Sequence, residues 1–111
     1  MRFRSVIYAA ILSLLAFQPA AAGFSDCSGL ATTRSFDGDR PVTVTFVNQT
    51  GAAIEIVWLN YRYLQEPIGT LQPGQSLVWP TYETNAFMFA ADGVCHALFI
   101  VERRTSTIEI R

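Results

Sequence analysis

The sequence predicts an all-β fold, a seven-stranded antiparallel β-sandwich that follows a cleavable leader. Apolar residues recur at every second position in several stretches after Pro41, which is the period of a half-buried strand. Segments rich in Gly, Pro and Asn separate these stretches roughly every 8–12 residues. No segment after residue 22 shows a convincing helical pattern. Short strands at this spacing are typical of a sandwich or a barrel.

Two alternating stretches, residues 42–47 and 54–59, predict the first two strands, and Asn48-Gln49-Thr50-Gly51 between them has turn chemistry. Residues 60–69 predict a short strand followed by a loop, because Glu66-Pro67 interrupts the pattern. Gln72-Pro73-Gly74-Gln75 then fits a type II turn, with Pro second and Gly third.

The second half continues the pattern. Residues 77–82 predict a strand that Pro80 interrupts or confines to a sheet edge, because proline cannot donate to the ladder. Residues 87–89 predict the next strand, which Asp92-Gly93 closes. Residues 94–101 and 105–111 predict the last two strands.

Residues 1–22 are expected to be a secretory signal peptide, cleaved after Ala22. A basic start precedes an apolar run over residues 6–17 and the small residues 20–22. A transmembrane anchor would need about 20 apolar residues. We therefore expect a secreted or periplasmic protein with no membrane span after cleavage, an irregular arm over residues 23–40 and a sandwich over residues 41–111. All basic residues are Arg, which is typical of a GC-rich bacterial genome.

Composition excludes several classes of function. The net charge of −1 leaves no basic stripe for a nucleic acid. One His and two Cys cannot build an ordinary four-ligand metal site, and no cofactor is expected. A catalytic Ser-His-Asp set would have to use His96, and neither paired carboxylates nor a phosphate-binding loop stands out. The sequence therefore favours a protein that is not an enzyme.

Cys27 and Cys95 are expected to form a disulfide, because export places them in an oxidising compartment. The functional alternative is a nucleophile pair of Cys95 and His96. Adjacent residues of a strand point to opposite faces, so the structural bridge is favoured.

Three short motifs have a distinctive order and spacing. They are Phe46-Val47-Asn48-Gln49-Thr50, Val57-Trp58-Leu59-Asn60-Tyr61 and Thr70-Leu71-Gln72-Pro73-Gly74. Together they resemble the β domain of the von Hippel–Lindau tumour suppressor family, well over residues 42–93 and loosely over residues 94–111. The resemblance implies a transthyretin-like (prealbumin-like) sandwich that binds peptides. In that family an aromatic-lined pocket receives a hydroxyproline of a partner peptide.

The resemblance also implies a set of site residues. Trp58 matches the pocket tryptophan of the family, while Ile68 stands in place of its pocket tyrosine. Thr81 replaces a serine that bonds the ligand hydroxyl, Asn85 replaces its histidine partner, and Phe87 replaces a second tryptophan. The expected peptide-binding residues are Trp58, Ile68, Thr81, Tyr82, Asn85 and Phe87. Strand parity alone leaves open whether Trp58 belongs to the core or to a pocket rim.

The sequence thus predicts an exported, non-catalytic module that binds a proline- or hydroxyproline-containing peptide or protein segment. The alternative is a structural, envelope-associated sandwich whose sheet edges pair with other subunits. No counterpart of the family's helical domain follows the β domain, so no ubiquitin-ligase partners are expected.

Overall fold

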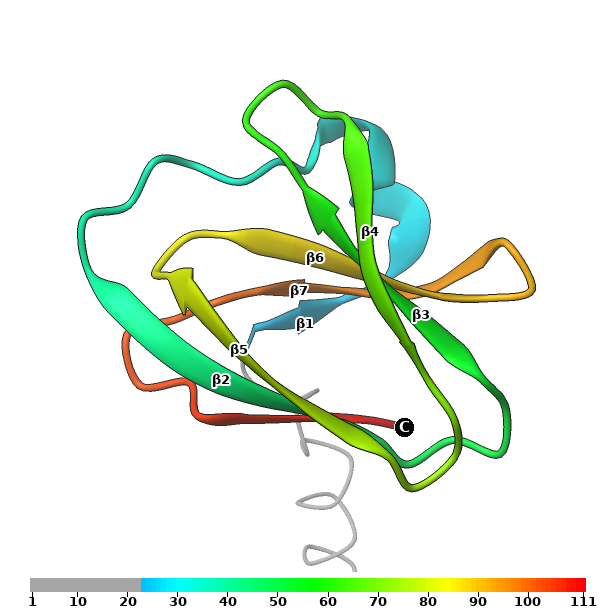
Figure 1. The fold of residues 1–111 in the computed structure, drawn as a ribbon. Helices are drawn as coiled ribbons and strands as arrows, with labels where there is room; N and C mark the ends of the chain where they lie inside the picture. The colour runs from blue at the N-terminus through cyan, green and yellow to red at the C-terminus, as the bar shows by residue number, and fades with distance from the viewer. Residues whose placement is uncertain (1–22) are drawn as a thin grey trace, which may run out of the picture.

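Two β-sheets pack face to face in the computed structural model, which describes residues 23–111 (Figure 1). The larger sheet has the strand order β1-β7-β6-β3-β4 and the smaller one β5-β2-β8. The expected signal peptide, residues 1–22, lies outside the described residues. The strands are β1 (Phe24–Ser25), β2 (Pro41–Asn48), β3 (Ile54–Leu59), β4 (Gln65–Leu71), β5 (Ser76–Tyr82), β6 (Ala86–Ala91), β7 (Val94–Ile100) and β8 (Thr107–Ile110).

The all-β prediction is confirmed, with two differences in detail. The arm over residues 23–40 contributes an additional two-residue strand, β1, and a 3-10 helix, η1 (Cys27–Thr32). The sandwich is not purely antiparallel either, because β8 pairs with β2 in parallel. Within residues 23–111, no helix is long and apolar enough to cross a membrane.

The prediction for residues 60–69 had the order of strand and loop reversed. Residues 60–64 form a turn, and the strand β4 begins only at Gln65 and includes Pro67. Pro67 is tolerated there because β4 lies at the edge of its sheet and pairs on one side only. Pro80 obeys the same rule in β5, the edge strand of the smaller sheet, as its position in the sequence predicts.

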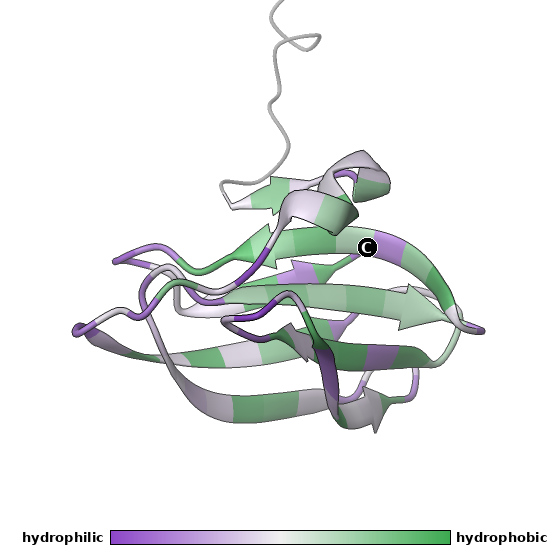
Figure 2. Cartoon of the chain, turned by 90° about the horizontal axis from the view of Figure 1, so that it is seen from above, coloured by the Kyte–Doolittle hydropathy of each residue, from purple (hydrophilic) through white to green (hydrophobic). Residues whose placement is uncertain are grey.

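The main core lies between the two sheets. Alternation in β2 directs Val44 and Phe46 inward, where Phe46 contacts Phe87 and Phe89 edge to face. Figure 2 shows the resulting alternation of apolar and polar bands along the strands. Ile54 and Ile56 of β3 complete this layer and leave the next inward position of that strand to Trp58.

A second apolar cluster covers the outer face of the larger sheet. It contains Val57 and Leu59 of β3, and Leu30 of η1 packs against it. The disulfide between Cys27 and Cys95, which the sequence predicts, joins η1 to β7 across this face. The bridge spans 68 residues, so the chain-entropy model assigns it about 4 kcal/mol of stabilisation.

Candidate functional site

Trp58 stands at the end of β3, where the inner layer of the sandwich meets solvent. Its side chain is half-buried and packs against the main core on the same face as Ile54 and Ile56. The ring of Tyr61 contacts the indole edge to face, with centroids 5.4 Å apart. Trp58 is therefore a core residue on one side of its ring and a surface residue on the other.

Asn85 holds the indole in this position. The indole Nε1 donates a hydrogen bond of 3.0 Å to Oδ1 of Asn85. The Asn85 Nδ2 donates in turn to the carbonyl oxygen of Phe36 at 3.3 Å. Only 4% of Asn85 is exposed, so both ends of its carboxamide are occupied inside the protein. Asn85, which the resemblance assigns to a ligand contact, thus anchors Trp58.

Thr81 lies inward on β5 at the same end of the sandwich. A tight turn separates it from Asn85, whose backbone N–H donates to the carbonyl oxygen of Tyr82 at 3.1 Å. Thr81 is 7% exposed, and within residues 23–111 its hydroxyl forms no hydrogen bond. A buried hydroxyl without a partner costs free energy, and a ligand that hydrogen-bonds to it would recover that cost.

The other residues that the resemblance assigns to the site differ in burial and in the direction of their side chains. Ile68 is half-buried at a bulge of β4 and packs against the main core. Phe87 is fully buried behind the site, where it pairs with Trp58 across the β3–β6 ladder. Tyr82 follows Thr81 and therefore points to the opposite, solvent face of its sheet. The structure thus places Trp58, Ile68, Thr81 and Asn85 toward the inner layer and Tyr82 away from it.

An exposed aromatic surface adjoins Trp58. Tyr61 and Tyr63 belong to the turn after β3, which Asn60 closes by accepting the backbone N–H groups of Arg62 and Leu64. Phe36 of the arm joins them through Arg34, whose guanidinium carbon lies 3.8 Å from the centroid of the Phe36 ring. The same guanidinium carbon lies 5.7 Å from the centroid of the Tyr63 ring.

Sequence reasoning missed Arg34 and Phe36, which lie in the segment interpreted as an irregular arm. No local pattern marks them. Their position depends on Ser35, whose backbone N–H donates to the carbonyl oxygen of Leu59 and whose hydroxyl accepts from the N–H of Ala86. These long-range bonds tie the arm across the ends of β3 and β6.

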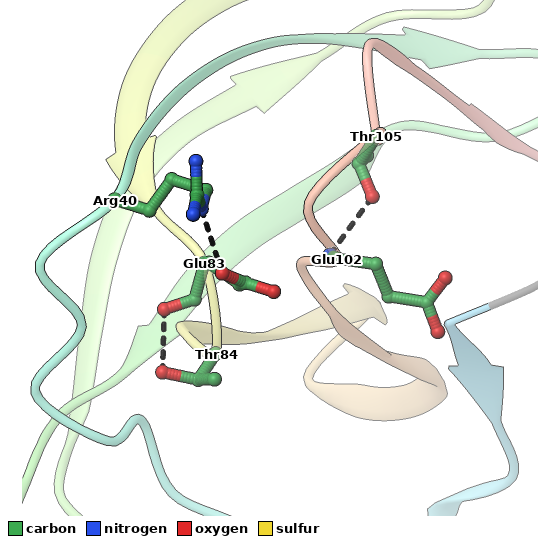
Figure 3. A network of polar contacts seen from close by, with 5 residues as sticks. All are labelled: Arg40, Glu83, Thr84, Glu102 and Thr105. Carbon is green, nitrogen blue, oxygen red and sulfur yellow. Dashed lines mark hydrogen bonds and ion pairs between the residues drawn. The ribbon is translucent and has the colours of Figure 1, made fainter.

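The turn between β5 and β6 is held against the arm by polar contacts (Figure 3). Arg40 and Glu83 form an ion pair of 3.4 Å, and the Thr84 hydroxyl donates to the carbonyl oxygen of Phe36 at 3.0 Å. Gly38 is required here, because an added Cβ would lie 2.1 Å from the carbonyl oxygen of Glu83. Within residues 23–111, no group of three or more metal-ligating side chains gathers here or elsewhere.

The first motif of the sequence is structural. Asn48 is fully buried, and its Nδ2 donates to the carbonyl oxygens of Ala52 and Leu71 at 2.8 and 2.9 Å. Its Oδ1 accepts from the backbone N–H and the hydroxyl of Thr50. The amide therefore joins the β2–β3 turn to the end of β4.

Two cavities of the described residues lie apart from Trp58. One, of about 540 Å³, is lined by the arm and the Glu83–Thr84 turn. The other, of about 500 Å³, lies at the opposite side of the sandwich between β8 and the pair β1 and β7. Trp58 lines neither of them, although Phe36 lines the first.

Comparison with known proteins agrees with this architecture. The family model described as VHL beta domain matches residues 33–105. The comparison with curated proteins found no match. The matched segment contains Trp58, Ile68, Thr81, Asn85 and the three motifs, and the domain that defines the family is a binding domain. The chain belongs to the VHL beta domain family.

Proposed function

We propose that the protein is an exported, non-catalytic binding module that recognises an extended peptide segment containing proline or hydroxyproline. The observation that carries this proposal is the half-exposed indole of Trp58, which Asn85 holds at the end of the sandwich where Thr81 also lies. Membership of a family of binding domains supports it. The disulfide, and the finding that residues 23–111 contain no membrane-spanning helix, are compatible with export.

The chemistry of the surface suits a proline ring. A compact, rigid pyrrolidine ring packs well on an aromatic face and loses little entropy on binding. The half-exposed indole of Trp58 and the exposed ring of Tyr61 supply such faces, and Ile68 adds an apolar contact. The neighbouring Tyr63 and Phe36 extend the apolar surface for further residues of the same segment.

Thr81 is the group that would distinguish hydroxyproline from proline. The Asn85 carboxamide already bonds to Trp58 and Phe36, so we assign the hydroxyl of Thr81 as the polar partner of the ligand. One neutral hydrogen bond contributes about 0.5–1.5 kcal/mol, which corresponds to a roughly 2- to 12-fold preference. We therefore expect a modest preference for hydroxyproline.

The test is isothermal titration of the purified protein with two peptides that differ only in proline against 4-hydroxyproline. We expect binding of both, a several-fold preference for the hydroxylated peptide, and loss of that preference in Thr81→Val, which keeps the shape of the side chain. Trp58→Ala should lower the affinity for both peptides at least tenfold. Tyr82→Ala is the matched control, because Tyr82 lies on the other face, and it should leave both affinities unchanged. Binding that is indifferent to Trp58→Ala would refute the proposal.

A further inference from the structure

The outer edge of β8 carries unpaired backbone groups. β8 pairs with β2 only, and the carbonyl oxygens of Ser106 and Ile110 accept from the N–H groups of Thr45 and Gln49 at 2.8 and 2.7 Å. In a parallel pair the residues that bond to the neighbouring strand alternate with residues that do not. The N–H and C=O groups of Thr107 and Glu109 therefore point away from β2. Within residues 23–111 they have no hydrogen-bond partner.

This edge borders the cavity of about 500 Å³. The opposite wall is formed by Phe24 of β1 and Phe99 of β7, whose rings meet edge to face with centroids 4.7 Å apart. Ala97 and Ile110 add apolar surface between the walls. The apolar surface of the cavity lies beside the unpaired N–H and C=O groups of β8. This combination suits an extended chain, which offers matching backbone groups and places alternate side chains on the apolar surface.

The charges around the cavity cancel. Glu102 and Glu109 face it together with Arg104 and Arg111, and Arg111 forms an ion pair with Glu109. Figure 3 shows the turn at one end, where the Glu102 N–H donates to the Thr105 hydroxyl at 2.9 Å. At the other end His96 Nε2 lies 2.7 Å from the carbonyl oxygen of Arg111. The rim thus favours an uncharged occupant over a polyanion.

We propose that this groove binds an uncharged, extended segment of a partner polypeptide, which pairs with β8 as a fourth strand of the smaller sheet. An extended chain offers the alternating N–H and C=O groups that match the outward groups of Thr107 and Glu109, which a helix or an irregular loop does not. The site is separate from the Trp58 surface, because its walls come from β8, β1 and β7, whereas Trp58 lies on β3, two strands from β7 in the larger sheet.

The experiment measures the fluorescence anisotropy of a dye-labelled heptapeptide, Thr-Val-Thr-Val-Thr-Val-Thr, titrated with the purified protein. We expect saturable binding that weakens at least tenfold when alternate peptide amides are N-methylated, because the occupant then loses its donors. Glu109→Pro removes one outward N–H of β8 and should also weaken binding at least tenfold. Glu109→Gln removes the same charge, keeps the N–H and should leave the affinity unchanged.

Three outcomes would overturn the proposal. They are an absence of saturable binding up to 1 mM peptide, equal affinity for the N-methylated peptide, and loss of binding in Trp58→Ala. The last outcome would assign the peptide to the Trp58 surface. If Glu109→Pro fails to fold, as circular dichroism would show, the N-methylated peptide decides the question with the unaltered protein. Dimerisation that Glu109→Pro abolishes, without peptide binding, would assign the edge to a second copy.

Discussion

The indole Nε1 of Trp58 donates to the carboxamide oxygen of Asn85 at 3.0 Å, across 27 residues of sequence. This bond joins the end of β3 to the turn before β6, and the Asn85 amide extends it to Phe36 of the arm. One buried carboxamide thereby positions both the tryptophan and the aromatic surface beside it. Asn85 therefore couples the position of Trp58 to that of Phe36.

Replacing Asn85 with Ala should release the indole and destabilise the fold. The change leaves the half-buried Trp58 donor without its acceptor, while the Phe36 carbonyl keeps the Thr84 hydroxyl, and the loss costs about 1–3 kcal/mol. Urea denaturation measures the loss, and fluorescence quenching in a Trp79→Phe background measures the exposure of Trp58. Unchanged quenching would mean that packing alone holds the indole.

Removal of the disulfide should reduce stability without changing the strand order. Cys27→Ser together with Cys95→Ser frees a loop of 68 residues, so the free energy of unfolding should fall by about 4 kcal/mol. Chemical denaturation of the variant and of the oxidised and reduced protein measures this difference. Reduction of the double variant, which has no bridge, is the control and should have no effect.

Asn48→Ala should destabilise the fold more than the loss of an exposed polar side chain would. The amide makes four hydrogen bonds from a fully buried position, and the loss should cost about 3 kcal/mol. Gln49→Ala is the neighbouring control, since Gln49 is exposed and its side chain accepts one surface bond from Arg111. Comparable denaturation midpoints for the two variants would contradict the structural role of the motif.

Gly38→Ala should separate the arm from the β5–β6 turn. The new methyl group would overlap the carbonyl oxygen of Glu83, so either the backbone moves or the protein loses about 1–3 kcal/mol. Gly51→Ala is the matched control, because nothing lies within 4 Å of a Cβ added there. Amide hydrogen exchange at Thr84 and Asn85 should rise in the first variant and stay constant in the second.

Asp26 should make stability dependent on pH. Its carboxylate accepts from the hydroxyl and the backbone N–H of Ser28, and these bonds lower the pKa of Asp26 below its ordinary value of 3.8. A lowered pKa in the folded state means that the stabilisation is present above pH 3.8 and is lost as the pH falls through the folded value. Between pH 6 and pH 2, the free energy of unfolding should fall more steeply in the unaltered protein than in Asp26→Asn. Identical slopes would contradict the contribution of the cap.

Local chemistry accounts for most of the fold. The two-residue alternation of Val44 and Phe46 marks a half-buried strand in any context, and Pro80 marks an edge, because proline lacks the donor that a central strand needs. Pro67 follows the same rule in β4, but the prediction took it as the start of a loop. Its strand pairs on one side only, and that is a property of the sheet rather than of the segment.

The sequence by itself determined the all-β class, the pairing of the only two cysteines and the motifs that mark the family, because each depends on residue type and spacing along the chain. Only the tertiary structure decided that Trp58 is core on one side and surface on the other, that Phe87 is fully buried, and that Phe36 joins the site. It also revealed the free edge of β8. These properties arise from contacts between segments distant in sequence, and periodicity within one segment carries no information about such contacts.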